Sequence, residues 1–256
     1  MKPENLVAGR NPVREALRGG RSINKILLAK EVEGRVIRDI KQLAREKDVP
    51  VQQVERALLD RMLPGTVHQG VIALGAEWEY VSLEDILSRA QKEDPFLILL
   101  NEITDPQNLG AIIRSAEAAG AHGIVLPARR SALLTSAVAR ASAGAVEYLP
   151  VARVTNLSQA IRYLKNNNIW VVGADSAARD LLWDVRLEGP VALVIGGEDK
   201  GLSTLVKKSC DLLVRIPLRG RIGSLNASAA AAVLAFEVFR QRRLAGQKNQ
   251  NEKHFS

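Results

Sequence analysis

The chain has 256 residues, of which 46% are hydrophobic and 25% are charged, and its net charge is +8. This composition is that of an ordinary globular protein of one or two domains. No apolar run is long enough to span a membrane, and the single cysteine, Cys210, excludes an internal disulfide. Because the first residues also lack the apolar core of a signal peptide, we expect a cytoplasmic protein.

The positive charge lies at the two ends of the chain. Residues 1–76 have 14 Lys/Arg against 9 Asp/Glu (+5), residues 77–239 have 17 against 18 (−1), and residues 240–256 have 5 against 1 (+4). Basic ends favour binding to a polyanion, although a solvated and highly soluble surface would have the same charge.

The first 76 residues are predicted to form a small α/β domain, followed by a linker. Apolar spacing predicts helices at 12–18, 34–47 and 55–63 and strands at 23–29, 49–54 and 71–74. Residues 77–95 are acidic, of mixed polarity and end at Pro95, so we expect a linker that contains a short helix.

Residues 96–243 have the pattern of a parallel sheet with helices on both faces, because short apolar strand candidates alternate with helices. The strands are predicted at 96–102, 123–127, 169–174, 191–196 and 212–218, and the helices at 109–119, 132–142, 157–167, 202–210 and 229–243. Residues 244–256 are polar and basic and are predicted to be a flexible tail.

Three loops follow strands of this sheet, and parallel sheets bind ligands at the carboxyl ends of their strands. In the first loop, NEITDPQNLGAIIR, Pro106 and Gly110 are the predicted turn residues and Asn108 is the predicted cap of the next helix. Arg114 lies in that helix among apolar neighbours. Its head group either extends to solvent or reaches a polar pocket.

The second loop, GGEDKGLS, begins with Gly196 and Gly197, which permit a close approach of the backbone to a ligand. Glu198 follows, either as a site residue or as an acid that stabilises the start of the next helix. The third loop, Arg219–Ser228, has two glycines and three small polar residues, among them Ser224 and Asn226. One of these could simply cap a helix, but a cap alone does not require the glycines and arginines beside it.

The motifs exclude several other chemistries. The chain has no Walker loop, no dinucleotide fingerprint and no Gly-x-Ser-x-Gly elbow. His68, His122 and His254 are scattered, and no Cys/His group has zinc spacing, so we expect no metal. The spacing of apolar residues and motifs therefore indicates an α/β protein with three convergent loops. It does not identify the ligand of these loops.

Taken together, the three loops resemble the motifs of the SpoU (TrmH-like) family of RNA ribose 2′-O-methyltransferases, in the SPOUT superfamily. The matching segments are NEITDPQNLGAIIRSAEAAGAHGIVLP, LVIGGEDKGLS and IPLRGRIGSLNASAAAAVLAFEVFRQR. AGRNPVREAL, HQGV and ASAGAVEYLPVARVTNL also resemble members with an N-terminal substrate-binding domain. These include methylases of a guanosine in large-subunit (23S) ribosomal RNA.

The resemblance implies a mostly parallel α/β sheet with a C-terminal trefoil knot, preceded by an L30e-like RNA-binding domain at residues 1–76. It also implies a homodimer formed through the C-terminal domain, and S-adenosylmethionine bound in the knot. By matching motifs, the residues expected at the cofactor are Gly173, Ala174, Gly196, Gly197, Ile216, Leu218 and Leu225.

The implied reaction is methyl transfer to a ribose 2′-hydroxyl, with Arg114 acting on that hydroxyl. A guanidinium normally stays charged, so orientation and electrostatic support are as possible as a role as base. The other polar site residues implied by the motifs are Asn108, Glu198, Ser224 and Asn226.

Three other functions stay open at this stage. One is a transfer-RNA ribose methyltransferase, and another is a non-catalytic RNA-binding protein with the same fold. The third, a nucleotide-dependent enzyme on an ordinary open sheet, is disfavoured because the phosphate fingerprint is missing.

Overall fold

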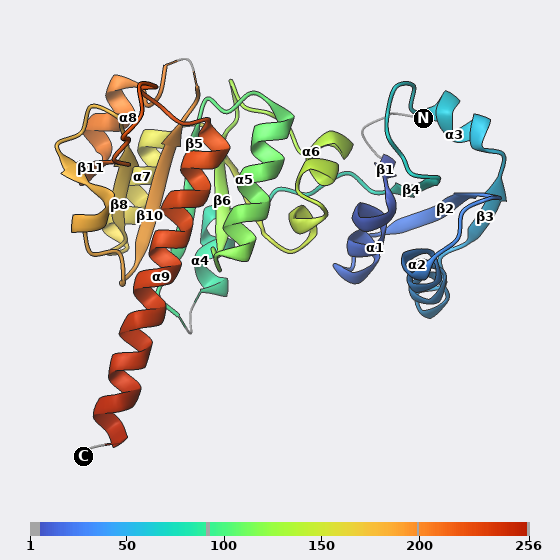
Figure 1. Cartoon of the computed structure of the whole chain (residues 1–256), viewed down its shortest axis with the longest axis horizontal. Coiled ribbons are helices and arrows are strands. Elements are labelled where there is room, and N and C mark those ends of the chain that lie inside the picture. Colours follow the sequence, from blue (N-terminus) through green and yellow to red (C-terminus); the bar gives the residue numbers. More distant parts are fainter. Residues whose placement is uncertain (1–5, 91–92, 199, 255–256) are drawn as a thin grey trace. The chain divides into compact units, whose positions relative to one another are not determined.

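The computed structural model describes residues 6–90, 93–198 and 200–254 (Figure 1). The described residues form two compact units. The first unit comprises the residues up to Glu79 together with Leu109–Arg114 and Leu133–Tyr148. The second unit comprises the remaining described residues, and it contains the loops that follow the predicted parallel strands.

The first unit contains a four-stranded mixed sheet with the order β1-β4-β2-β3. One cluster of buried side chains joins this sheet to α1 and α2, and a second joins it to α3, so both faces are covered. Strand β1 was not predicted, because three residues are too short to show a pattern. The bounds are β1 Leu6–Ala8, α1 Arg10–Arg18, β2 Ile23–Ala29, α2 Arg35–Glu46, β3 Val51–Val54, α3 Arg56–Met62, β4 Val71–Gly75, α6 Ser136–Ala141 and η2 Ala145–Glu147.

The second unit contains a seven-stranded sheet with the order β7-β6-β5-β10-β8-β11-β9, and every neighbouring pair is parallel. The predicted α/β class is therefore confirmed. The bounds are α4 Leu83–Arg89, β5 Phe96–Asn101, β6 Gly123–Pro127, β7 Val151–Val154, α7 Leu157–Asn166, β8 Trp170–Ala174, β9 Asp180–Leu181, η3 Leu182–Asp184, β10 Val191–Gly196, α8 Thr204–Ser209, β11 Leu212–Arg215 and α9 Ala227–His254. Helix α5, Pro106–Ala118, has its middle residues Leu109–Arg114 in the first unit and its two ends in the second.

Helices cover both faces of this sheet (Figure 1). Side chains of α4, α7 and α8 join β5, β8 and β10 in one buried cluster, and α9 packs against β10. All six residues of β5 are buried, which fits the continuous apolar run that predicted it. The order of the strands changes direction at β5, because β6 lies on one side of it and β10 on the other. This switch point is where open α/β sheets place a ligand.

Helix α5 begins earlier than predicted. Pro106 is its first residue, and Asp105 is its cap, accepting from the backbone N–H groups of Gln107 at 3.1 Å and Asn108 at 3.2 Å. The prediction that Asn108 caps this helix was therefore wrong, as was the prediction that Gly110 lies in a turn. A Cβ on Gly110 would come within 2.3 Å of the Cβ of Ala141, so this glycine permits close packing.

The carboxyl-terminal elements also differ from the prediction. Strand β11 ends at Arg215, and the two short strands β7 and β9 were not predicted. Helix α9 continues to His254, so the prediction of a flexible tail is wrong for residues 244–254, while residues 255–256 lie outside the described part. None of the helices in the described part is long and apolar enough to cross a membrane.

Candidate functional site

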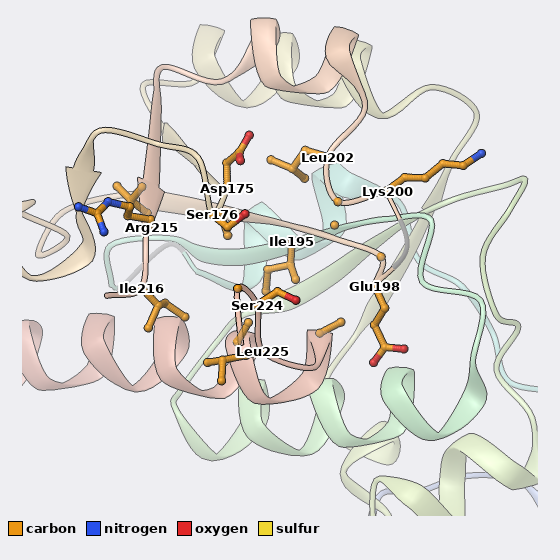
Figure 2. A pocket seen from close by; sticks show the side chains of 18 of the residues that line it. Asp175, Ser176, Ile195, Glu198, Lys200, Leu202, Arg215, Ile216, Ser224 and Leu225 are labelled. Carbon is orange, nitrogen blue, oxygen red and sulfur yellow. The ribbon is translucent and has the colours of Figure 1, made fainter. Parts of the chain in front are cut away.

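A cavity of about 360 Å³ opens at the carboxyl ends of β8, β10 and β11, and we call it the first cavity (Figure 2). It lies between the loop after β8, the loop after β10 and the long loop that joins β11 to α9. Its lining mixes aliphatic side chains with both signs of charge. The lining residues are Ala174, Asp175, Ser176, Ile195, Gly196, Gly197, Glu198, Lys200, Gly201, Leu202, Lys207, Val214, Arg215, Ile216, Leu218, Gly223, Ser224, Leu225, Ala227 and Ala230.

The loop after β10 folds tightly back onto the end of its own strand. A Cβ on Gly196 would lie 2.2 Å from the carbonyl carbon of Gly201 and 2.5 Å from the backbone N of Leu202. The Gly197 N–H donates to the Asn101 carbonyl at 2.9 Å, and the Gly201 N–H donates to the Gly197 carbonyl at 2.9 Å. The two glycines are therefore required by backbone packing, and the same packing shapes the cavity wall.

A polar cluster joins the three loops. The Asn108 Nδ2 donates to Glu198 Oε1 at 3.1 Å, and the Asn226 Nδ2 donates to Asn108 Oδ1 at 3.0 Å and also to Glu198 Oε1. The three side chains come from α5, from the loop after β10 and from the start of α9. We call this set the Asn–Glu–Asn cluster. It uses side chains from all three predicted motifs.

Asn226 also caps α9. Its Oδ1 accepts from the Ser228 N–H at 2.9 Å, from the Ser228 hydroxyl at 2.6 Å and from the Ala229 N–H at 3.3 Å. One amide therefore caps the helix and also joins the Asn–Glu–Asn cluster. Its oxygen stabilises the helix, while its nitrogen holds Glu198 and Asn108.

A second charged group lies at the far side of the first cavity. Lys207 Nζ is 2.5 Å from Asp175 Oδ2, and the Ala177 N–H donates to Asp175 Oδ1 at 2.9 Å. Burial opposes ionisation of Asp175, but these hydrogen bonds outweigh it and lower the pKa of the carboxyl. The cavity therefore has a fixed negative group that is already paired with a cation.

A second cavity of about 250 Å³ adjoins the first. The two share Gly197, Glu198, Lys200 and Gly201, so one segment of the loop after β10 forms a wall of both. The other lining residues come from the loops after β5 and β6 and from α5. They are Glu102, Ile103, Thr104, Asp105, Asn108 and Arg130.

Most of the predicted cofactor residues line the first cavity, and Gly173 does not. A Cβ on Gly173 would lie within 3.0 Å of Leu213, Leu202 and Cys210 side chains, so this glycine permits packing beneath the cavity.

Burial, followed by the nearby Asp211 carboxylate, raises the pKa of the Cys210 thiol to about 11, as expected for a structural cysteine.

Arg114 lies outside both cavities. It is exposed, and no hydrogen bond or ion pair is found for it among the described residues. On an α-helix, six residues correspond to about 9 Å along the axis and about 240° around it, so Arg114 does not share the face of Asn108. The structure thus brings together Asn108, Glu198 and Asn226, with Ser224 in the adjoining cavity wall, and leaves Arg114 apart.

Sequence reasoning missed five polar or charged residues of the first cavity: Asp175, Ser176, Lys200, Lys207 and Arg215. Asp175 and Arg215 stand at or just after strand ends, a signal that could have identified them. Lys207 lies on α8 and could be found only from the fold. Among the described residues, no group of three or more His, Cys, Asp or Glu could hold a metal ion.

The first cavity lies at the carboxyl ends of parallel strands, where α/β proteins bind ligands, and its lining suits a ligand with both apolar and polar parts. The sequence model of the SpoU rRNA Methylase family matches residues 95–236. The model of the RNA 2′-O ribose methyltransferase substrate binding domain matches residues 6–81.

Individual relatives agree with these matches. YacO of Bacillus subtilis (strain 168), named for the TrmH family of tRNA/rRNA methyltransferases, is 44% identical over 245 residues, which are 95% of this chain and 98% of YacO. The structure of the SpoU methyltransferase AviRb from Streptomyces viridochromogenes, in complex with AdoMet, has a TM-score of 0.77 at 28% identity and covers 93% of this chain and 90% of that one. The AdoMet-bound rRNA methyltransferase from Sinorhizobium meliloti has a TM-score of 0.77 at 27% identity and covers 92% and 86%.

The chain therefore belongs to the SpoU family and is an S-adenosylmethionine-dependent RNA methyltransferase. The first cavity fits this cofactor chemically. Aliphatic side chains such as Ile216, Leu218 and Leu225 suit an adenine ring, and Asp175 and Lys207 can meet polar groups.

The glycine at the end of β10 gives the first testable prediction. Gly196→Ala forces the backbone of residues 201–202 to move, so we expect the affinity for S-adenosylmethionine to fall about tenfold or more in calorimetry. Gly189→Ala is the matched control, because nothing lies within 4 Å of its new methyl group. Wild-type affinity in Gly196→Ala would show that this loop does not shape the cofactor site.

Asn226→Asp separates the two roles of Asn226. Aspartate keeps the acceptor that caps α9, but it loses the N–H donors and places a carboxylate against Glu198. Because the loss of these donors releases Glu198 and Asn108, we expect methyl transfer to RNA to fall about 10- to 100-fold. The melting temperature should fall by only a few degrees per lost hydrogen bond, since each contributes about 1–3 kcal/mol. The control is Ser228→Ala, which removes only a capping hydroxyl. Equal activity of both variants would remove the cluster from the reaction.

Proposed function

We propose that the protein transfers a methyl group to the 2′-hydroxyl of a guanosine in large-subunit ribosomal RNA. The observation that carries the proposal is the Asn–Glu–Asn cluster, which lies where the first and second cavities meet. A methyl donor in one cavity and an acceptor nucleotide in the other would approach each other at this junction. The substrate-binding match at residues 6–81 and the ribosomal-RNA relative support this substrate.

In this proposal the protein binds and orients its two substrates, and the cofactor, when bound, supplies an electrophilic methyl group. Glu198, held by two amide donors, and the hydroxyl of Ser224 form the polar surface against which the ribose is positioned. None of the described residues that line either cavity is a histidine, so the proposed mechanism has no imidazole base.

The proposed cofactor contacts are the first-cavity residues that also match the family motifs. They are Ala174, Gly196, Gly197, Ile216, Leu218 and Leu225, with Gly173 supporting them from beneath. The same proposal makes the segment from β11 to α9 the trefoil knot. In support, this segment forms one wall of the cavity, and α9 then packs on β10.

We further propose a cytoplasmic homodimer whose second-unit helices form the interface. Phe236 and Phe239 support this, because they are 45% and 40% exposed on α9 and lie edge to face with ring centroids 6.2 Å apart. Exposed aromatic neighbours of this kind mark interaction surfaces. A second copy could also supply the contact that the exposed Arg114 lacks among the described residues of one chain.

Arg114 is proposed to orient the ribose hydroxyl or an adjacent phosphate. If so, its planar fork matters and Lys cannot replace it, so Arg114→Lys and Arg114→Ala should both lose methyl transfer by about 10²-fold. The measurement is incorporation of labelled methyl groups into ribosomal RNA. Cofactor affinity, melting temperature and dimer content should match the wild type. Near-normal turnover of a well-folded Arg114→Ala protein would contradict the role.

Residues 1–76 are proposed to be the RNA-binding domain, of the L30e-like type. Arg35, Arg38 and Arg45 are exposed on α2. Replacing all three by Gln should weaken RNA binding and reduce the slope of log K against log salt by about 2–3, since each lost phosphate contact removes about 0.7–0.9. Equivalent changes at three exposed arginines of the second unit, Arg162, Arg179 and Arg186, serve as the control. Equal slopes for the two triple variants would place RNA binding elsewhere.

A transfer RNA is the alternative substrate, since YacO is named for both RNA classes. Parallel assays with ribosomal RNA and transfer RNA, followed by digestion to nucleosides, distinguish the two. 2′-O-methylguanosine from ribosomal RNA alone is the expected product.

A further inference from the structure

The second cavity has no assigned ligand, yet its lining is strongly polar. Of its residues, Glu198 and Asn108 are already engaged in the Asn–Glu–Asn cluster, and both oxygens of Asp105 accept from the start of α5. Lys200 belongs to the wall shared with the first cavity, and two further charged side chains remain for a ligand. They are Glu102, just after β5, and Arg130, in the loop after β6.

Glu102 and Arg130 form an ion pair across this cavity, with Arg130 Nη1 3.0 Å from Glu102 Oε1. No other hydrogen bond is found for either side chain among the described residues, so Glu102 Oε2 and the remaining N–H groups of Arg130 stay available. Their loops are also joined through the backbone, because the Ala132 N–H donates to the Ile103 carbonyl at 2.8 Å. The pair is therefore presented by two loops that are fixed to each other.

Both residues have a backbone conformation that side chains disfavour. The φ angle is +59° at Glu102 and +57° at Arg130, in the left-handed region where glycine is the ordinary residue. An exposed ion pair is worth too little to justify this conformation at two positions, since such pairs contribute about 0–1 kcal/mol. Strained residues with functional side chains cluster at ligand sites, and here they occur at both ends of one ion pair.

The chemistry of the pair selects among the nucleobases. A carboxylate with a free oxygen accepts best from two adjacent N–H donors, and a guanidinium donates to a neighbouring carbonyl. Guanine alone among the four RNA bases has two such donors, N1–H and N2–H, next to a carbonyl at O6. Uracil, adenine and cytosine each offer the carboxylate a single donor position on this edge.

We infer that the second cavity receives the acceptor nucleotide and that Glu102 and Arg130 read its base as guanine. The inference rests on the proposed function and adds the residues that select the base. Glu102 accepts from the guanine N1–H and N2–H groups, and Arg130 donates to O6. To enter the cavity the base leaves its stack, as a base does when an enzyme takes it into a pocket. The wall that the two cavities share, formed by Gly197, Glu198, Lys200 and Gly201, places its ribose next to the first cavity.

The test uses the full-length protein, labelled S-adenosylmethionine and unmodified ribosomal RNA transcripts. We expect the wild type to form 2′-O-methylguanosine, and Glu102→Gln and Arg130→Gln to lower kcat/KM by at least about tenfold, because a bidentate base contact is worth that much discrimination. Affinity for S-adenosylmethionine should stay unchanged. Arg129→Gln is the matched control, since Arg129 is the exposed neighbour of Arg130 and does not line the cavity.

If Glu102→Gln disturbs the loop, Glu102→Gly provides a second test of the same role. Glycine relieves the positive φ, so the melting temperature should be equal or higher while the activity falls and other 2′-O-methylnucleosides appear. A structural role would give the opposite pattern, with stability and activity falling together.

The outcomes also separate this inference from the function on which it rests. A wild-type protein that methylates no ribose in any RNA overturns the proposed function. A wild-type product on another base overturns the guanosine of the proposed function together with the base-reading role. Full activity and unchanged base preference in Glu102→Gln and Arg130→Gln, with 2′-O-methylguanosine as the wild-type product, overturn only the base-reading role.

Discussion

The Asn–Glu–Asn cluster is the interaction on which the rest of the site depends. Its members come from three loops that are far apart in sequence, and two amide side chains converge on one carboxylate oxygen of Glu198. The cluster is partly open to solvent, so each hydrogen bond adds only about 1–3 kcal/mol to stability. Its main effect is positional, because it fixes the start of α9 and the loop after β10 relative to α5.

The parallel sheet explains why these loops meet. Strand β10 pairs with β5 in register up to Gly196 and Asn101, so both strands end at the same edge. The loop after β10 then turns back sharply at Gly196 and Gly197, and it becomes a wall shared by the first and second cavities. A donor and an acceptor can therefore be held on two sides of a single short segment. Proximity of this kind is what a methyl-transfer enzyme must supply.

Much of this arrangement could be predicted from the sequence. Continuous apolar runs located β5, β6 and β10. The loops after parallel strands also pointed to Gly196 and Glu198, which line the first cavity, and to Asn226, which donates to Glu198. Capping propensity alone misplaced the cap of α5, because Asn108 and Asp105 are both good capping residues. Pro106 was the signal that favours Asp105, since proline is common at the first position of a helix. Lys207 and the Glu102–Arg130 pair could not be found, since their partners lie on other elements and depend on how the sheet is ordered.

The most direct measurement is a map of 2′-O-methylation in cellular RNA with and without this protein. We expect a guanosine in large-subunit ribosomal RNA to lose its 2′-O-methyl group when the protein is absent. The wild-type protein should restore that group, and Asn226→Asp should not. An unchanged map of ribosomal RNA, or loss of a methyl group only from transfer RNA, would contradict the proposed substrate.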